Sequence, residues 1–159
     1  MKYANIFIRF QIYRFLNLTL CWECYVKLSN KERPVINLTG IVLDCTNAED
    51  LAEFYHKLLG WKKTHSGNGW AGLTAPNGMV LAFQAVDEYK PPVWPWKPVD
   101  QGQMIHLDMR VNNLEKAVEF AVSCGAQIAD AQYFDDSRTM IDPAGHTFCL
   151  DASHLTTKL

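Results

Sequence analysis

An internal duplication is the feature of the sequence that most limits how this chain can fold. The segments GIVLDCTNAEDLAEFYHKLLGW and HLDMRVNNLEKAVEFAVSCGAQ each read as a strand, a polar cap, an amphipathic helix and a glycine. Asn47 matches Asn113, and Phe54 matches Phe120, 66 residues further along. A repeat of this length indicates two copies of one supersecondary unit, which bury their apolar faces together.

Local signals mark where each predicted helix begins and ends. Thr46 and Glu49 have the spacing of a capping box, and Gly60 supplies the left-handed residue that ends a helix. In the second copy, Asn112 and Gly125 take the same places. The pattern predicts one amphipathic helix in each copy.

Short strand signals follow each helix and are separated by turns. The first set, WAGLTAPNGMVLAFQAV, has its turn at Asn77 and Gly78, and the second, RTMIDPAGHTFCLD, has its turn at Pro143–Gly145. We expect Asp142 to form that second turn through bonds to its own backbone, and His146 to be a loop residue. The fold class is therefore predicted to be α+β, with two tandem βαβββ modules.

The predicted domain organisation is a short arm followed by one domain. Residues 1–36 form an N-terminal arm that lacks the repeat, and residues 37–155 form the domain. Within that domain we assign module one to 37–87, a linker to 88–102 and module two to 103–155. A chain of 159 residues is too short for two ordinary domains.

The N-terminal arm contains no predicted membrane span. Its longest uncharged run, from Phe15 to Trp22, is much shorter than the roughly 20 residues a span needs, and no clear signal-peptide cleavage site is visible. Cys21 and Cys24 have the spacing of a redox or zinc motif, but no second pair accompanies them, so we interpret this spacing as accidental.

Charge and cysteine content exclude some function classes. The net charge is −2 and the lysines and arginines are scattered, so nucleic acid is not an expected partner. The five cysteines are odd in number, and three lie in apolar patterns, which favours a reduced protein in the cytoplasm.

The duplicated module, the helix end AEFYHKLLGW and the closing DPAGHTFCLD together resemble the vicinal oxygen chelate superfamily. The resemblance covers roughly Asn37 to Ala152 and is closest to the glyoxalase-like subgroup related to bleomycin-resistance proteins. It implies strands that curl into a cup, a dimer, and a site inside the cup. It also implies functions from metal-dependent lyases, epimerases and dioxygenases to drug-binding proteins that use no metal.

The resemblance implies four metal-ligand positions, at Gly40, Ala82, His106 and Cys149. Gly40 and Ala82 have no donor atom in their side chains, which leaves His106 and Cys149 as an incomplete pair. A catalytic metal normally has about three protein ligands. Asp108 is a possible third ligand on the same strand face. We predict that the protein uses no metal and no cofactor.

A candidate ligand site follows from two further features. In MIHLDMRVNN the polar residues alternate with apolar ones, which places His106 and Asp108 on one face of a strand. The proline-rich linker YKPPVWPWKP holds its tryptophans stiffly and could roof the cup. The candidate ligand-binding residues are His106, Asp108, Trp70, Phe83, Trp94 and Trp96.

We predict that the protein binds a small, flat, partly apolar organic molecule in the cup of a homodimer. Two alternatives stay open: a divalent-metal-dependent lyase, isomerase or dioxygenase with a degenerate site, and a non-catalytic interaction module whose cup is filled by side chains such as Trp70, Phe83 and Met140. The sequence identifies no catalytic residue. Serine hydrolase, Rossmann and P-loop motifs are absent from it.

Overall fold

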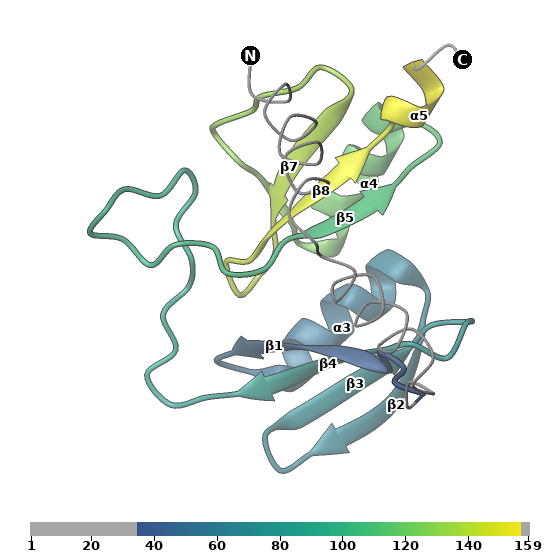
Figure 1. The fold of residues 1–159 in the computed structure, drawn as a ribbon, viewed down its shortest axis with the longest axis vertical. Coiled ribbons are helices and arrows are strands. Elements are labelled where there is room, and N and C mark those ends of the chain that lie inside the picture. Colours follow the sequence, from purple (N-terminus) through teal and green to yellow (C-terminus); the bar gives the residue numbers. More distant parts are fainter. Residues whose placement is uncertain (1–34, 157–159) are drawn as a thin grey trace, which may run out of the picture. The chain divides into compact units, whose positions relative to one another are not determined.

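The two copies of the repeat fold as two similar modules in the computed structural model, which describes residues 35–156 (Figure 1). The first module contains β1 (Gly40–Cys45), α3 (Ala48–Leu59), β2 (Lys62–Gly67), β3 (Trp70–Thr74) and β4 (Val80–Ala85). The second contains β5 (Leu107–Arg110), α4 (Leu114–Cys124), β6 (Gln127–Ile128), β7 (Ser137–Ile141) and β8 (Thr147–Asp151), followed by the short helix α5 (Ser153–Thr156). The α+β class and the tandem βαβββ modules are confirmed. The predicted features at Cys21 and Cys24 lie outside the described residues.

Each module forms its own four-stranded mixed sheet. The strand orders are β1-β4-β3-β2 and β5-β8-β7-β6, with the first strand of each module parallel to the last. The remaining neighbours are antiparallel. Among residues 35–156, no strand of one sheet pairs with a strand of the other.

The helices begin one residue later than the capping pattern at Thr46 and Asn112 predicts. The side-chain oxygen of Asn47 accepts the backbone N–H groups of the first turn at 3.0 and 3.2 Å, and that of Asn113 accepts one at 2.9 Å. Both asparagines have the extended backbone of an N-cap. The helices end at the predicted glycines, whose φ angles are 68° and 117°.

Each sheet has one face covered by its helix and one open face. In β1, Leu43 and Cys45 are buried against the core, whereas Val42 and Asp44 are exposed. The covered faces of both sheets, together with α3 and α4, contribute to one hydrophobic core cluster. We call the other side of the first sheet, which includes Val42, Asp44 and Trp70, the first open face. The matching side of the second sheet is the second open face.

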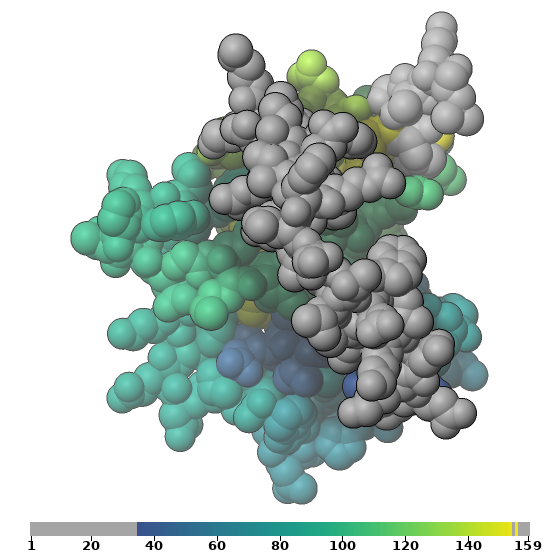
Figure 2. Space-filling view, viewed as in Figure 1, coloured from purple at the N-terminus to yellow at the C-terminus, as the bar shows by residue number. Residues whose placement is uncertain are grey.

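The linker between β4 and β5 lies at the surface, where its side chains are visible in the space-filling view (Figure 2). Trp96 and Val99 are mostly exposed there. Within the described part of the chain, the helices are too short and too polar to cross a membrane.

Candidate functional site

A pocket with a cavity of about 560 Å³ lies on the second open face, and we call it the open-face pocket. Its lining includes Trp94 from the linker, His106 and Asp108 from the β5 segment, and Cys149 from β8. Because side chains alternate along a strand, Leu107 and Met109 point the other way and pack against the core. The predicted alternation along this strand therefore places the polar pair at the pocket.

His106 and Asp108 form the polar centre of the open-face pocket. The Nε2 atom of His106 lies 3.4 Å from an Asp108 carboxylate oxygen, and its Nδ1 atom lies 3.4 Å from oxygens of Gln103 and Thr147. The His106 side chain is 23% exposed and the Asp108 side chain 75% exposed. The imidazole can donate and accept hydrogen bonds, and the carboxylate can only accept them.

Aromatic side chains form one wall of this pocket. The Trp94 indole N–H donates a hydrogen bond to the carbonyl of Ala131 at 3.2 Å. The Trp94 ring also meets Tyr133 edge to face, with centroids 5.8 Å apart. Tyr133 and Phe134 are mostly exposed and line the pocket too. Both were missing from the sequence prediction, and the one available signal was a pair of aromatic residues in a polar stretch.

The structure brings together three of the six candidate residues and separates the other three. Trp70 belongs to the first open face, and Trp96 is exposed in the linker beside Gly102. Phe83 is fully buried and its ring stacks on that of Tyr55, with centroids 5.4 Å apart. The expectation that Phe83 lines the ligand site needs correction, because its side chain leaves β4 on the face that packs against the core.

Three side chains of the kinds that bind metals meet in the open-face pocket. Ligand atoms of His106, Asp108 and Cys149 all lie within 4.8 Å of one another. Burial raises the pKa of the Cys149 thiol, and the hydrogen bond with Thr139 offsets only part of that effect. The raised pKa opposes formation of the thiolate that a metal ion needs.

The first module does not supply its share of the ligand set that the resemblance implies. Ala82 has no donor atom, and a Cβ atom added at Gly40 would lie 2.8 Å from the carbonyl oxygen of Val80. A ligand side chain at position 40 would therefore collide with the neighbouring strand. The residues present do not fit the four-position metal set.

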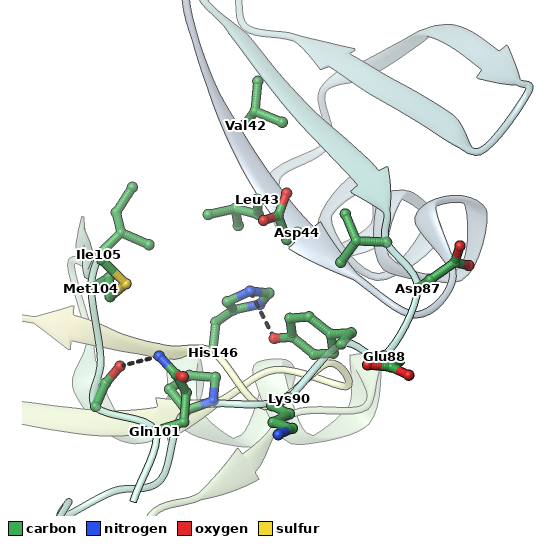
Figure 3. Close-up of a pocket in the computed structure, with 14 residues that line it drawn as sticks. Val42, Leu43, Asp44, Asp87, Glu88, Lys90, Gln101, Met104, Ile105 and His146 are labelled. Atoms are coloured by element: carbon green, nitrogen blue, oxygen red, sulfur yellow. Dashed lines mark hydrogen bonds between the residues drawn. The ribbon is translucent and has the colours of Figure 1, made fainter.

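A second pocket, with a cavity of about 500 Å³, lies between β1, the linker and the β7–β8 turn, and we call it the linker pocket (Figure 3). His146, expected to be an ordinary loop residue, lines it and is only 7% exposed. Asp142 accepts the backbone N–H groups of Ala144 and His146, both at 2.9 Å, as the turn prediction requires. It also accepts the Tyr55 hydroxyl, which comes from the first module.

Comparison with known proteins agrees with this architecture. A family model described as glyoxalase-like domain matches residues 40–150. Nothing among the curated proteins matches the chain.

Several solved structures share the fold. One is a glyoxalase/bleomycin resistance protein/dioxygenase family enzyme from Burkholderia phytofirmans PsJN, with 16% identity, a TM-score of 0.57, and coverage of 74% of this chain and 98% of that one. A glyoxalase/bleomycin resistance protein/dioxygenase from Nocardioides has 18% identity, a TM-score of 0.57, and coverage of 82% and 91%. A glyoxalase-related enzyme from Fulvimarina pelagi has 19% identity, a TM-score of 0.54, and coverage of 74% and 88%. At such identities the likeness concerns the fold alone.

The family model, by contrast, spans well over half of the chain and both copies of its repeat. The protein therefore belongs to the glyoxalase-like domain family of the vicinal oxygen chelate superfamily.

Proposed function

We propose that the protein binds a small, flat, partly apolar organic molecule in the open-face pocket without using a metal ion. The observation that carries this proposal is the meeting of Trp94, His106 and Asp108 around one cavity of about 560 Å³. Small-molecule sites usually combine an apolar lining with a few placed polar groups, in volumes of roughly 300–1,000 Å³. The open-face pocket has a volume in this range, and it combines three aromatic rings with polar side chains that include Asp108, Asp136 and Asp151.

The fixed position of Trp94 supports a stacking role. Its indole N–H is already bound to a backbone carbonyl and its ring already packs against that of Tyr133, so little conformational entropy remains to be lost when a ligand packs on it. His106 can donate a hydrogen bond to a polar group of the ligand or accept one from it, and Asp108 can accept one.

Tryptophan fluorescence tests this proposal. Flat aromatic compounds should quench the fluorescence saturably. For the compound that binds most tightly, Trp94→Ala should weaken the binding free energy by about 1–3 kcal/mol, the scale of one buried aromatic contact. His106→Ala should weaken the binding of compounds that carry a hydrogen-bonding group. Trp96→Ala is the matched control, because Trp96 lies in the same linker but outside the pocket.

Two results would count against this site. Unchanged binding in both Trp94→Ala and His106→Ala would place the ligand elsewhere. Absence of saturable binding across a broad aromatic library would favour the alternative of a non-catalytic interaction module.

We also propose that two chains associate in the cytoplasm to complete the binding cup. The two sheets share a core through their covered faces, and no strand connects them in residues 35–156, so each keeps a separate open face. Val42 and Trp70 expose apolar surface on the first open face, at 49% and 38% exposure. A second copy could cover that surface and bring it opposite the open-face pocket.

Metal-dependent lyase, isomerase or dioxygenase activity is the second candidate, favoured by the cluster of His106, Asp108 and Cys149. Elemental mass spectrometry on dialysed protein distinguishes it from the first. We expect well below one equivalent of zinc, nickel, manganese or iron, with a melting temperature that chelators do not change. Stoichiometric metal that is lost in His106→Ala would instead support the second candidate.

A further inference from the structure

The chain contains two Asn–Gly pairs, and each lies in a hairpin turn of the first module (Figure 1). Asn68 and Gly69 join β2 to β3, and Asn77 and Gly78 lie between β3 and β4. In such a pair the backbone nitrogen of glycine can attack the side-chain carbonyl carbon of asparagine, because glycine has no Cβ atom to hinder the approach. The hydrogen bonds that these two groups already make therefore decide how reactive each turn is.

The Asn77 turn holds both reacting groups in hydrogen bonds. The side-chain oxygen of Asn77 accepts the backbone N–H of Met79 at 3.1 Å, and the N–H of Gly78 donates to the carbonyl of Ala75 at 2.9 Å. The N–H of Ala75 in turn donates to the carbonyl of Met79 at 2.8 Å. The glycine nitrogen can attack only after it and the asparagine side chain have each lost a hydrogen bond, so this turn opposes the reaction.

The Asn68 turn holds neither reacting group in this way. Among residues 35–156, no hydrogen bond involves the Asn68 side chain or the backbone N–H of Gly69. Both residues are exposed, and their φ angles of 55° and 77° are those of a two-residue hairpin turn between the paired residues Gly67 and Trp70. The attacking nitrogen and the side-chain carbonyl are therefore adjacent in the chain, exposed and free of competing bonds.

We propose that Asn68 is a site of spontaneous covalent modification, at which the asparagine becomes aspartate or isoaspartate. The backbone nitrogen of Gly69 bonds to the side-chain carbonyl carbon of Asn68. The bond from that carbon to the amide nitrogen breaks, and the amide leaves as ammonia with the proton of the Gly69 N–H. Water then opens the cyclic imide: cleavage at the side-chain carbonyl gives aspartate, and cleavage at the backbone carbonyl gives isoaspartate. This site does not depend on the function proposed for the open-face pocket.

The modification changes both the charge and the backbone of the hairpin. Either product places a new carboxylate two residues before Trp70. In isoaspartate the chain also continues through the side-chain carbon, which adds one methylene group to the backbone of the turn. A two-residue turn fixes the register of the strands that it joins, so the longer turn no longer fits the pairing of Gly67 with Trp70. Isoaspartate therefore loosens the hairpin between β2 and β3.

Peptide mapping by mass spectrometry tests the proposal on the full chain, incubated at mildly alkaline pH either folded or unfolded in guanidinium chloride. In the folded chain, the amide-to-acid mass change should accumulate about tenfold faster at Asn68 than at Asn77, because only the Asn77 turn must first break hydrogen bonds. In the unfolded chain the two rates should become similar, since each site is then an Asn–Gly pair without a turn. Separation of the isomeric peptides should show isoaspartate as well as aspartate at position 68.

Asn68→Gln is the matched variant. A glutamine would have to close a six-membered imide, so the mass change at position 68 should disappear over the same incubation, while the rate at Asn77 stays the same. Two results would overturn the proposal. One is conversion of Asn77 as fast as that of Asn68 in the folded chain, and the other is an Asn68 that stays intact in the folded chain while the unfolded chain converts.

Discussion

At the scale of single residues, Asp142 connects the two modules through a buried charged hydrogen bond. The Tyr55 hydroxyl donates to its carboxylate at 2.9 Å, and the tyrosine ring is fully buried. Tyr55→Phe should lower the free energy of unfolding by about 1–3 kcal/mol, because a buried acceptor loses one of its donors. Urea unfolding measures this change.

Tyr133→Phe is the matched control for that measurement, because Tyr133 is 62% exposed. Its effect should stay within about 0.5 kcal/mol. Equal effects of the two substitutions would show that the Tyr55 contact adds nothing to stability.

Cys45 gives the protein a specific sensitivity to alkaline pH. Burial raises the pKa of its thiol from 9.0 to about 11. The folded state therefore holds the thiol proton more tightly than the unfolded state does. This contribution to stability is complete below pH 9 and is lost as the pH rises toward 11.

Cys45→Ala removes that contribution, so the variant should lose less stability than the parent protein between pH 9 and pH 11. Urea unfolding at a series of pH values measures both curves. If the free energies of unfolding of the two proteins fell in parallel with pH, the Cys45 thiol would not be a source of the alkaline sensitivity.

At the scale of elements, the N-cap of α3 offers a direct test of the corrected helix start. Asn47→Ala should lower the free energy of unfolding by about 1 kcal/mol, because the side chain accepts two N–H groups of the first turn. Thr46→Ala is the control, since the exposed Thr46 is not the cap. A larger loss from Thr46→Ala, measured by thermal or urea unfolding, would restore the capping box predicted from the sequence.

Elements with strong local signals were predicted, and those that depend on partners were not. The helices and their terminal glycines follow from periodicity and backbone conformation, both of which are local. Strand β2, with the sequence KKTHSG, has no apolar alternation and forms by pairing with β3. The orientation of Phe83 was also beyond the sequence, because VLAFQA lacks the polar contrast that would distinguish its two faces.

At the scale of the whole molecule, contacts between distant residues limited the site prediction. His106 and Asp108 could be paired from the alternation of one strand. The linker composition indicated Trp94 and Trp96 equally as a roof over the ligand, and of these two only Trp94 lines the open-face pocket. The approach of Tyr89 to His146 joins residues 57 positions apart, and no local pattern encodes it. Tyr133 reaches Trp94 in the same way, through tertiary packing.

Association of two chains is expected for the protein in solution. Light scattering coupled to size-exclusion chromatography should give the mass of two chains. Trp70→Glu should shift the protein toward one chain, because it places a charge on the first open face, whereas Trp96→Glu in the exposed linker should not. A single-chain mass for the unmodified protein would contradict the proposed homodimer.

A flat ligand should lie between Trp94 and the His106–Asp108 pair, and NMR of the indole and imidazole groups can detect it there. The probe is the aromatic compound with the strongest fluorescence quenching, added to protein labelled with ¹⁵N at tryptophan and histidine. The Trp94 indole signal, assigned with Trp94→Phe, and the His106 ring signals should shift saturably while the Trp96 signal stays in place. Saturable shifts at Trp70 or Trp96, with Trp94 and His106 unchanged, would place the ligand outside the open-face pocket.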